Sequence, residues 1–172
     1  GAWREVADMR MDGVIVAAST AAEFSTEAPI IAIDPHIINS RYPSVQGTNY
    51  RGAMDAMEYL IGLGHRRIGF INGRPEIVSS ERRLKGYQEA LQKAGIPLAP
   101  ALSVPGDYST ETGRVRALEL LSMDNPPSAI FAANDQSALG VYQAAEELGM
   151  RIPEDLSVVG FDNISETRFR GL

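Results

Sequence analysis

The chain alternates short apolar runs with longer segments in which apolar residues recur every three or four positions. The runs at residues 30–33, 68–71 and 129–133 contain little polar alternation, which is typical of strands covered on both faces. Residues 49–63 and 135–148, by contrast, have helical spacing. Strands that alternate with helices in this way predict an α/β fold with parallel sheets and right-handed crossovers.

The same patterns predict the other elements. We expect further strands at residues 14–18, 44–46, 101–104 and 158–161, further helices at 79–94 and 110–121, and the end of a helix at 2–11. Side chains that favour helix starts precede or open the helices, namely Thr48 or Asn49, Ser79-Ser80-Glu81, Ser109 or Thr110, and Asn134. In the helix at 110–121 we expect Val115, Leu118 and Leu121 to face inward.

Composition excludes several classes of protein. At 172 residues, 44% apolar and 22% charged, the sequence indicates a globular domain, and the absence of cysteine excludes disulfides and thiolate chemistry. No apolar run is long enough to cross a bilayer, and the first residues are not a signal peptide. We therefore expect a soluble, cytoplasmic protein without membrane contact. A net charge of −6 argues against a nucleic-acid surface in this chain.

Three polar residues directly follow predicted strands, namely Asp34, Asn134 and Asp162. In parallel sheets, ligands bind beyond the carboxyl ends of the strands. A carboxylate accepts two hydrogen bonds and an amide both donates and accepts, which suits a hydroxylated ligand. The simpler interpretation is structural, with Asn134 only capping a helix and Asp162 only capping loop amides.

An enzymatic role has little support. We find no Walker-type phosphate loop, no Gly-x-Gly-x-x-Gly after a strand and no Gly-x-Ser-x-Gly. His36 and His65 lack metal-ligand spacing, and His65 fits a helix end. We expect neither a catalytic residue nor a metal or cofactor site. An enzyme on a flavodoxin-like sheet is an alternative that requires a titratable pair with perturbed pKa values in a cleft.

Residues 131–140 and 149–163 resemble the effector-binding domain of LacI/GalR-type bacterial transcriptional regulators. Asn49, Gly52-Ala53 and Gly64-His65-Arg66 also follow that pattern, whereas Thr48 replaces the usual Asp. The resemblance implies a periplasmic-binding-protein-like type I fold with two doubly wound, flavodoxin-like subdomains. Residues 1–46 would then be part of an incomplete N-terminal subdomain, and residues 47–172 most of the C-terminal subdomain.

The resemblance also implies effector-binding residues. Arg83 falls on the family's Arg-x-x-Gly-Tyr pattern, Tyr108 matches an aromatic residue that stacks on the ligand, and Asn134 and Asp162 bind ligand hydroxyls. Asp34 would contribute from the opposing subdomain. The alternatives are a solvated arginine, the role we give to Arg82, and a loop tyrosine that packs on the sheet.

The function implied is allosteric control of transcription by a small effector, and hydroxyl-binding residues such as Asn134 and Asp162 favour a sugar over a purine. Leu139, Tyr142, Ile164 and Phe169 resemble positions at which such regulators form homodimers, although ordinary packing on the chain's own sheet explains the spacing equally well. Operator DNA would be contacted by a headpiece absent from this chain. The main alternative is a periplasmic sugar-binding protein of a transporter.

Overall fold

The structure, a computed structural model, describes residues 12–17, 24, 26–36 and 41–165, and contains two parallel sheets. Strands β1 (Val14–Ala17), β2 (Ile30–Ile33) and β3 (Ser44–Val45) form the first sheet in that order. Strands β4 (Ile68–Ile71), β5 (Ser103–Val104), β6 (Ala129–Ala132) and β7 (Ser157–Val159) form the second, in the order β5-β4-β6-β7. The predicted α/β fold with parallel sheets is confirmed. The helix end expected at residues 2–11 lies outside the described residues.

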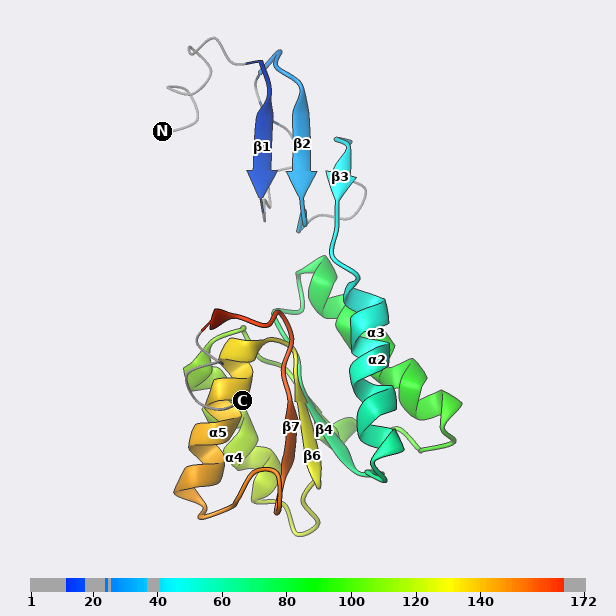
Figure 1. Cartoon of the computed structure of the whole chain (residues 1–172), viewed down its shortest axis with the longest axis vertical. Helices are drawn as coiled ribbons and strands as arrows, with labels where there is room; N and C mark the ends of the chain where they lie inside the picture. The colour runs from blue at the N-terminus through cyan, green and yellow to red at the C-terminus, as the bar shows by residue number, and fades with distance from the viewer. Residues whose placement is uncertain (1–11, 18–23, 25, 37–40, 166–172) are drawn as a thin grey trace.

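Helices cover both faces of the second sheet (Figure 1). The helices are α2 (Asn49–Gly62), α3 (Val78–Lys93), α4 (Thr110–Leu121) and α5 (Asp135–Glu147). Helices α2 and α3 pack on one face around Met57, Phe70 and Phe131, while α4 and α5 pack on the other around Leu120 and Ile130. Every residue of β4 and β6 is buried, as the uninterrupted apolar runs predicted.

The first sheet differs from this pattern. The described part of β1 and β2 buries Val16, Ile30 and Ala32, but Ile15 is 72% exposed and Ile31 is 47% exposed. The prediction of strands buried on both faces is therefore wrong for this sheet within the described residues. Figure 1 shows the arrowheads of β1, β2 and β3 pointing toward the end of the second sheet at which α5 begins. The carboxyl ends of the two sheets therefore face the same region.

Helix starts were predicted correctly where the capping side chain bonds locally. The Ser109 hydroxyl accepts the Thr112 N–H at 3.1 Å, and the Asn134 side chain accepts the Ser137 N–H at 2.9 Å. The prediction that Ser79-Ser80-Glu81 caps α3 is wrong, because the helix already begins at Val78, and Ile77 at its N-cap position makes no side-chain cap. Thr48 occupies the N-cap position of α2, but its side chain makes no capping hydrogen bond.

Three further details correct the predictions. The segment at 101–104 begins with a 3-10 turn, η1 (Pro100–Leu102), because proline favours the first turn of a helix, and only Ser103–Val104 pairs as a strand. Strand β7 ends at Val159, so Phe161 lies in the following loop. In α4, Val115 is 39% exposed while Leu120 is fully buried, because the inward face is set by contact with α5.

Among the described residues no helix is long and apolar enough to cross a membrane.

Candidate functional site

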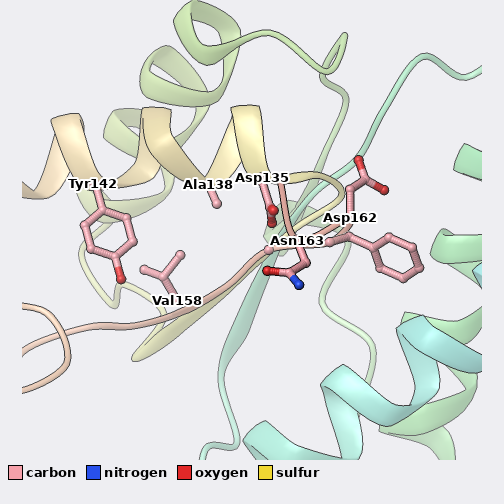
Figure 2. A pocket seen from close by; sticks show the side chains of 8 residues that line it. Asp135, Ala138, Tyr142, Val158, Asp162 and Asn163 are labelled. Carbon is pink, nitrogen blue, oxygen red and sulfur yellow. The ribbon is translucent and has the colours of Figure 1, made fainter. Parts of the chain in front are cut away.

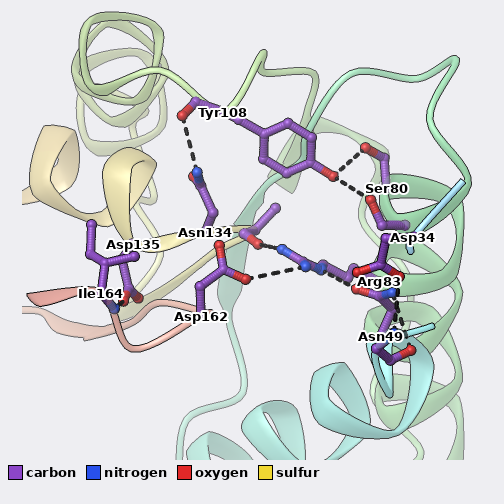
Figure 3. Close-up of polar contacts among 12 residues, drawn as sticks. Asp34, Asn49, Ser80, Arg83, Tyr108, Asn134, Asp135, Asp162 and Ile164 are labelled. Atoms are coloured by element: carbon purple, nitrogen blue, oxygen red, sulfur yellow. Dashed lines mark hydrogen bonds and ion pairs between the residues drawn. The ribbon is translucent and has the colours of Figure 1, made fainter. Parts of the chain in front are cut away.

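Four of the five predicted effector residues form one connected cluster at the carboxyl end of the second sheet (Figure 3). Asn134 follows β6, Asp162 follows β7, Tyr108 lies between β5 and α4, and Arg83 lies in the second turn of α3. The fold brings them together because parallel strands end at the same edge, next to the start of α3.

Arg83 is the centre of this cluster, with only 8% of its surface exposed. Its Nε donates to Asn49 Oδ1 at 2.9 Å, Nη1 donates to the Ala133 carbonyl oxygen, and Nη2 lies 3.4 Å from Asp162 Oδ1. A buried guanidinium requires such partners, because an unpaired charge in the interior is costly. The alternative interpretation of Arg83 as a solvated arginine is therefore wrong. Arg82 donates to the Gln46 side chain.

Two aromatic rings flank the guanidinium group. The Arg83 Cζ atom lies 3.8 Å from the centre of the Phe161 ring and 5.9 Å from that of Tyr108. A Cβ atom at Gly52 in α2 would lie 2.7 Å from Phe161 Cε2, so this glycine leaves room for the ring. The Phe161 ring is thus held between α2 and Arg83, where it adds a cation–π interaction to the hydrogen bonds.

Tyr108 is fixed at both ends. Its hydroxyl lies 2.6 Å from Ser80 Oγ and 3.1 Å from Ser79 Oγ, and its carbonyl accepts a hydrogen bond from Asn134 Nδ2 at 3.1 Å. The backbone at Tyr108 has a φ of 72°, and the ring packs closely on Gly73. The alternative prediction, a loop tyrosine that packs on the sheet, therefore holds in part, because the ring packs on Gly73 after β4. The ring is nevertheless only half-buried and borders the site.

Asn134 combines capping with a tertiary contact. The same side chain that caps α5 through its oxygen also donates to the loop that carries Tyr108. An amide nitrogen has a second hydrogen, so one donor remains after the Tyr108 contact. The structural role and a ligand-binding role of Asn134 are therefore compatible.

Asp162 is in an unusual local environment. Its φ is 100° and the next residue, Asn163, has a φ of 58°, in the left-handed region that side chains seldom adopt. Partial burial raises the pKa of Asp162 above its usual value, and the charges of Asp135 and Asp34 raise it further, whereas Arg83 lowers it. The side chain is still 42% exposed and can accept hydrogen bonds from a ligand.

Asp34 stands apart from these contacts. It follows β2 with a φ of 43°, and its Oδ1 accepts the Gly47 N–H at 2.9 Å, in the segment that joins the two sheets. No described contact joins Asp34 to the other four candidates, although its charge acts on Asp162. The structure therefore places Asp34 beside the cluster, on the side of the first sheet (Figure 3).

A groove of about 570 Å³ borders the cluster along α5 and β7 (Figure 2). Its lining includes Tyr142 and Val158 along its length and Asp162 at the end nearest Arg83. A second groove of about 460 Å³ shares Tyr142 and continues past Met150. Among the described residues, no group of His, Asp or Glu side chains is arranged to hold a metal ion.

Sequence reasoning missed several residues of the site. The sequence predicts Phe161 at the end of a strand and Asn49 and Ser80 as helix caps, but the side chains of Phe161 and Asn49 contact Arg83 and that of Ser80 contacts Tyr108. His65 lies just after the end of α2, as predicted, and outside the cluster its ring joins Ser128 Oγ at 2.8 Å and Ser157 Oγ at 3.0 Å, where β6 and β7 begin. These contacts join segments far apart in the chain, so local pattern carried no signal for them.

Comparison with known proteins identifies the family. A family model described as a periplasmic binding protein-like domain matches residues 57–170, which is more than half of the chain. The chain belongs to this family. The similar curated proteins are transcriptional repressors, and the solved structures that resemble this chain include regulators of the LacI family.

Three proteins illustrate the similarity. The HTH-type transcriptional repressor CytR of Escherichia coli K12 is 38% identical over 141 residues, covering 82% of this chain and 41% of CytR. A LacI-family regulatory protein from Chloroflexus aggregans superposes with a TM-score of 0.85 at 28% identity, covering 98% of this chain and 63% of that protein. The transcriptional regulator CelR, in a complex with cellobiose, superposes with a TM-score of 0.84 at 30% identity, covering 94% of this chain and 52% of CelR. The chain spans about half the length of the curated relatives it matches, namely 41% of CytR and 52% of the probable HTH-type transcriptional repressor ExuR of Bacillus subtilis.

Proposed function

We propose that this chain is the effector-binding part of a LacI-type transcriptional repressor, and that a small neutral sugar binds at Arg83, Tyr108, Asn134 and Asp162. The observation that carries the proposal is the position of Arg83. Its guanidinium group lies within 3.4 Å of Asp162 and between two aromatic rings, at the edge where β6 and β7 end.

The chemistry of the cluster suits a polyhydroxylated ligand. Asp162 supplies acceptors, Asn134 a remaining donor, and Arg83 has five N–H groups of which the described contacts use three. Sugar hydroxyls can donate and accept at the same time, and a half-buried aromatic ring such as Tyr108 suits the C–H face of a sugar. The complex of CelR with cellobiose supports this ligand class by analogy.

We further infer that the ligand lies between two subdomains. Residues 1–46 would belong to the N-terminal subdomain and residues 47–172 to the C-terminal subdomain. The carboxyl ends of both sheets face the same region, and Asp34 follows β2 on the far side of the cluster, which supports this division. Asp34 would then contact the ligand from the opposite side.

Regulation would follow from a population shift. A ligand that binds one arrangement of the subdomains more tightly favours that arrangement, which changes the geometry of a homodimer and hence the fit of DNA-binding headpieces to operator half-sites. Such a headpiece would lie outside this chain. We place the dimer contact at Leu139, Tyr142, Ile164 and Phe169, the last of which lies outside the described residues.

Calorimetry on the chain tests the ligand class. Glucose, galactose, ribose, cellobiose, adenosine and guanine would be titrated into the wild type and into Asp162→Asn. We expect one of the sugars to bind, and Asp162→Asn to weaken that binding by about tenfold or more, because a charged acceptor is replaced by an amide.

The matched control is Asp55→Asn, which neutralises an exposed carboxylate paired with Arg51 in α2, away from the cluster. It should leave the affinity unchanged. Binding of adenosine or guanine alone, or equal effects of the two substitutions, would contradict the proposed sugar site.

A further inference from the structure

Asp135, the first residue of α5, contacts both ends of a short turn that carries Asp162. Its backbone N–H donates to the Phe161 carbonyl oxygen at 2.8 Å, and its side-chain Oδ2 accepts the Ile164 N–H at 2.8 Å. Asp135 is buried, with only 7% of its surface exposed. One residue therefore anchors the chain immediately before and after Asp162-Asn163 (Figure 3).

The turn between these anchors is strained. Asp162 and Asn163 both have positive φ angles, 100° and 58°, and neither is glycine. Such conformations cost free energy and persist only where the surrounding contacts hold them in place. The two hydrogen bonds to Asp135 fix the residues on either side of the turn, and the contact of Arg83 with Asp162 holds the turn itself.

Gly160 makes this arrangement possible because it lacks a side chain, and not because of an unusual backbone conformation. A Cβ atom at Gly160 would overlap Asp135 Oδ1, and would lie 3.3 Å from the Cβ of Ala138. Any larger residue at position 160 would therefore push the Asp135 carboxylate away from the Ile164 N–H. The close approach of β7 to the start of α5 depends on this glycine.

We propose that Asp135 is the positioning residue of the effector site, holding the Asp162-Asn163 turn through the Ile164 N–H so that Asp162 lies against Arg83. The inference rests on the proposed function in taking Asp162 as a ligand contact. The anchoring itself is a property of the chain without ligand. It can therefore be measured even if no sugar binds.

Charge and hydrogen bonding at Asp135 can be separated. Asp135→Asn keeps an oxygen that can accept the Ile164 N–H but removes the negative charge, whereas Asp135→Ala removes both. The charge of Asp135 is one cause of the raised pKa of Asp162, so its removal should lower that pKa. The hydrogen bond should instead control the exchange of the Ile164 amide proton.

Nuclear magnetic resonance on the unliganded chain tests this directly. In Asp135→Ala and Gly160→Ala we expect the Ile164 amide to exchange with solvent about tenfold faster or more, because local opening of the turn becomes easier. In Asp135→Asn we expect most of the protection to remain and the pKa of Asp162, followed through its carboxyl carbon, to fall.

Glu81→Ala is the matched control. Glu81 is also an acidic residue in the first turn of its helix, so its loss removes the same favourable interaction with the helix dipole, but Glu81 is exposed and makes no described contact with the turn. It should leave Ile164 exchange unchanged. Equal Ile164 exchange in the wild type, Asp135→Ala and Gly160→Ala would overturn the inference.

Titration with cellobiose keeps the two proposals distinguishable. If cellobiose binds, Asp135→Ala should weaken that binding by about tenfold, with Asp135→Asn intermediate, since the turn is then mispositioned. If none of the sugars in the panel binds but Ile164 protection depends on Asp135, the proposed sugar site fails and the positioning role stands.

Discussion

At Asp162 a carboxylate is held in an environment that opposes its ionisation. Burial and the nearby charges of Asp135 and Asp34 raise its pKa, and the contact with Arg83 at 3.4 Å compensates only in part. A side chain that is incompletely satisfied within the protein has capacity left for a ligand. Binding sites commonly keep such groups at a cost to stability.

The raised pKa of Asp162 predicts a specific pH dependence. The pKa of Asp162 in the folded chain lies above its unfolded value of about 3.8. The contribution of Asp162 to the free energy of unfolding is therefore fully present below pH 3.8 and is lost as pH rises through the folded pKa. Asp162→Asn should therefore raise the free energy of unfolding at pH 7, by less than about 1 kcal/mol because solvent screens the half-exposed group. The gain should disappear near pH 3, as measured by thermal unfolding.

Asp155→Asn provides a control of opposite sign. Hydrogen bonds from Arg151 lower the pKa of Asp155 to about 2, so its stabilising contribution is present above the unfolded value and is lost as pH falls through the folded pKa. That variant should be less stable than the wild type at pH 7. A destabilised Asp162→Asn at pH 7 would show that the Arg83 contact outweighs burial.

Among the elements, α4 and α5 pack unusually closely. A Cβ atom at Gly140 in α5 would overlap the Thr110 carbonyl oxygen, and one at Gly113 in α4 would lie 2.8 Å from the Ser137 Cα. The two helices therefore meet backbone to backbone. This contact matters for the site because Ser109 and Asn134, which cap the two helices, hold the loop of Tyr108 and the end of β6.

Gly140→Ala should destabilise the chain by about 1–3 kcal/mol, since the added methyl group forces α4 and α5 apart. Gly62→Ala near the end of α2 is the control, because a Cβ atom there meets nothing within 4 Å. It should stabilise the chain by about 0.5–1 kcal/mol, as replacing a helical glycine reduces the freedom of the unfolded chain. Urea unfolding of both variants measures these changes, and a Gly140→Ala variant as stable as the wild type would refute the close contact.

At the scale of the whole molecule, α5 connects the candidate site to the proposed dimer interface. Its buried residues, including Val141 and Ala144, face the sheet and α4, while Leu139 and Tyr142 remain partly exposed. Asp135 at its start contacts the turn of Asp162. One helix thus carries both a residue that orients the proposed effector site and the proposed dimer contact.

Leu139→Glu tests the proposed dimer. We expect the wild type to sediment as a dimer and the variant as a monomer, with a dissociation constant raised about 100-fold, because a charge would be buried in an isologous contact. Tyr59→Glu is the control, since Tyr59 is 64% exposed on α2, which covers the opposite face of the sheet. A monomeric wild type, or equal effects of the two variants, would contradict this interface.

The sequence by itself determined the order and type of the elements and the polar residues that follow β2, β6 and β7, because apolar periodicity and strand ends are local properties. Only the tertiary structure decided what those residues contact. Arg83 bonds to Asn49, Ala133 and Asp162, which are 34, 50 and 79 positions away. Phe161 lies after β7 and not within it, and its ring stacks on Arg83 in the space that Gly52 of α2 leaves free. Contacts of this kind depend on how helices pack across a sheet, and no local pattern encodes them.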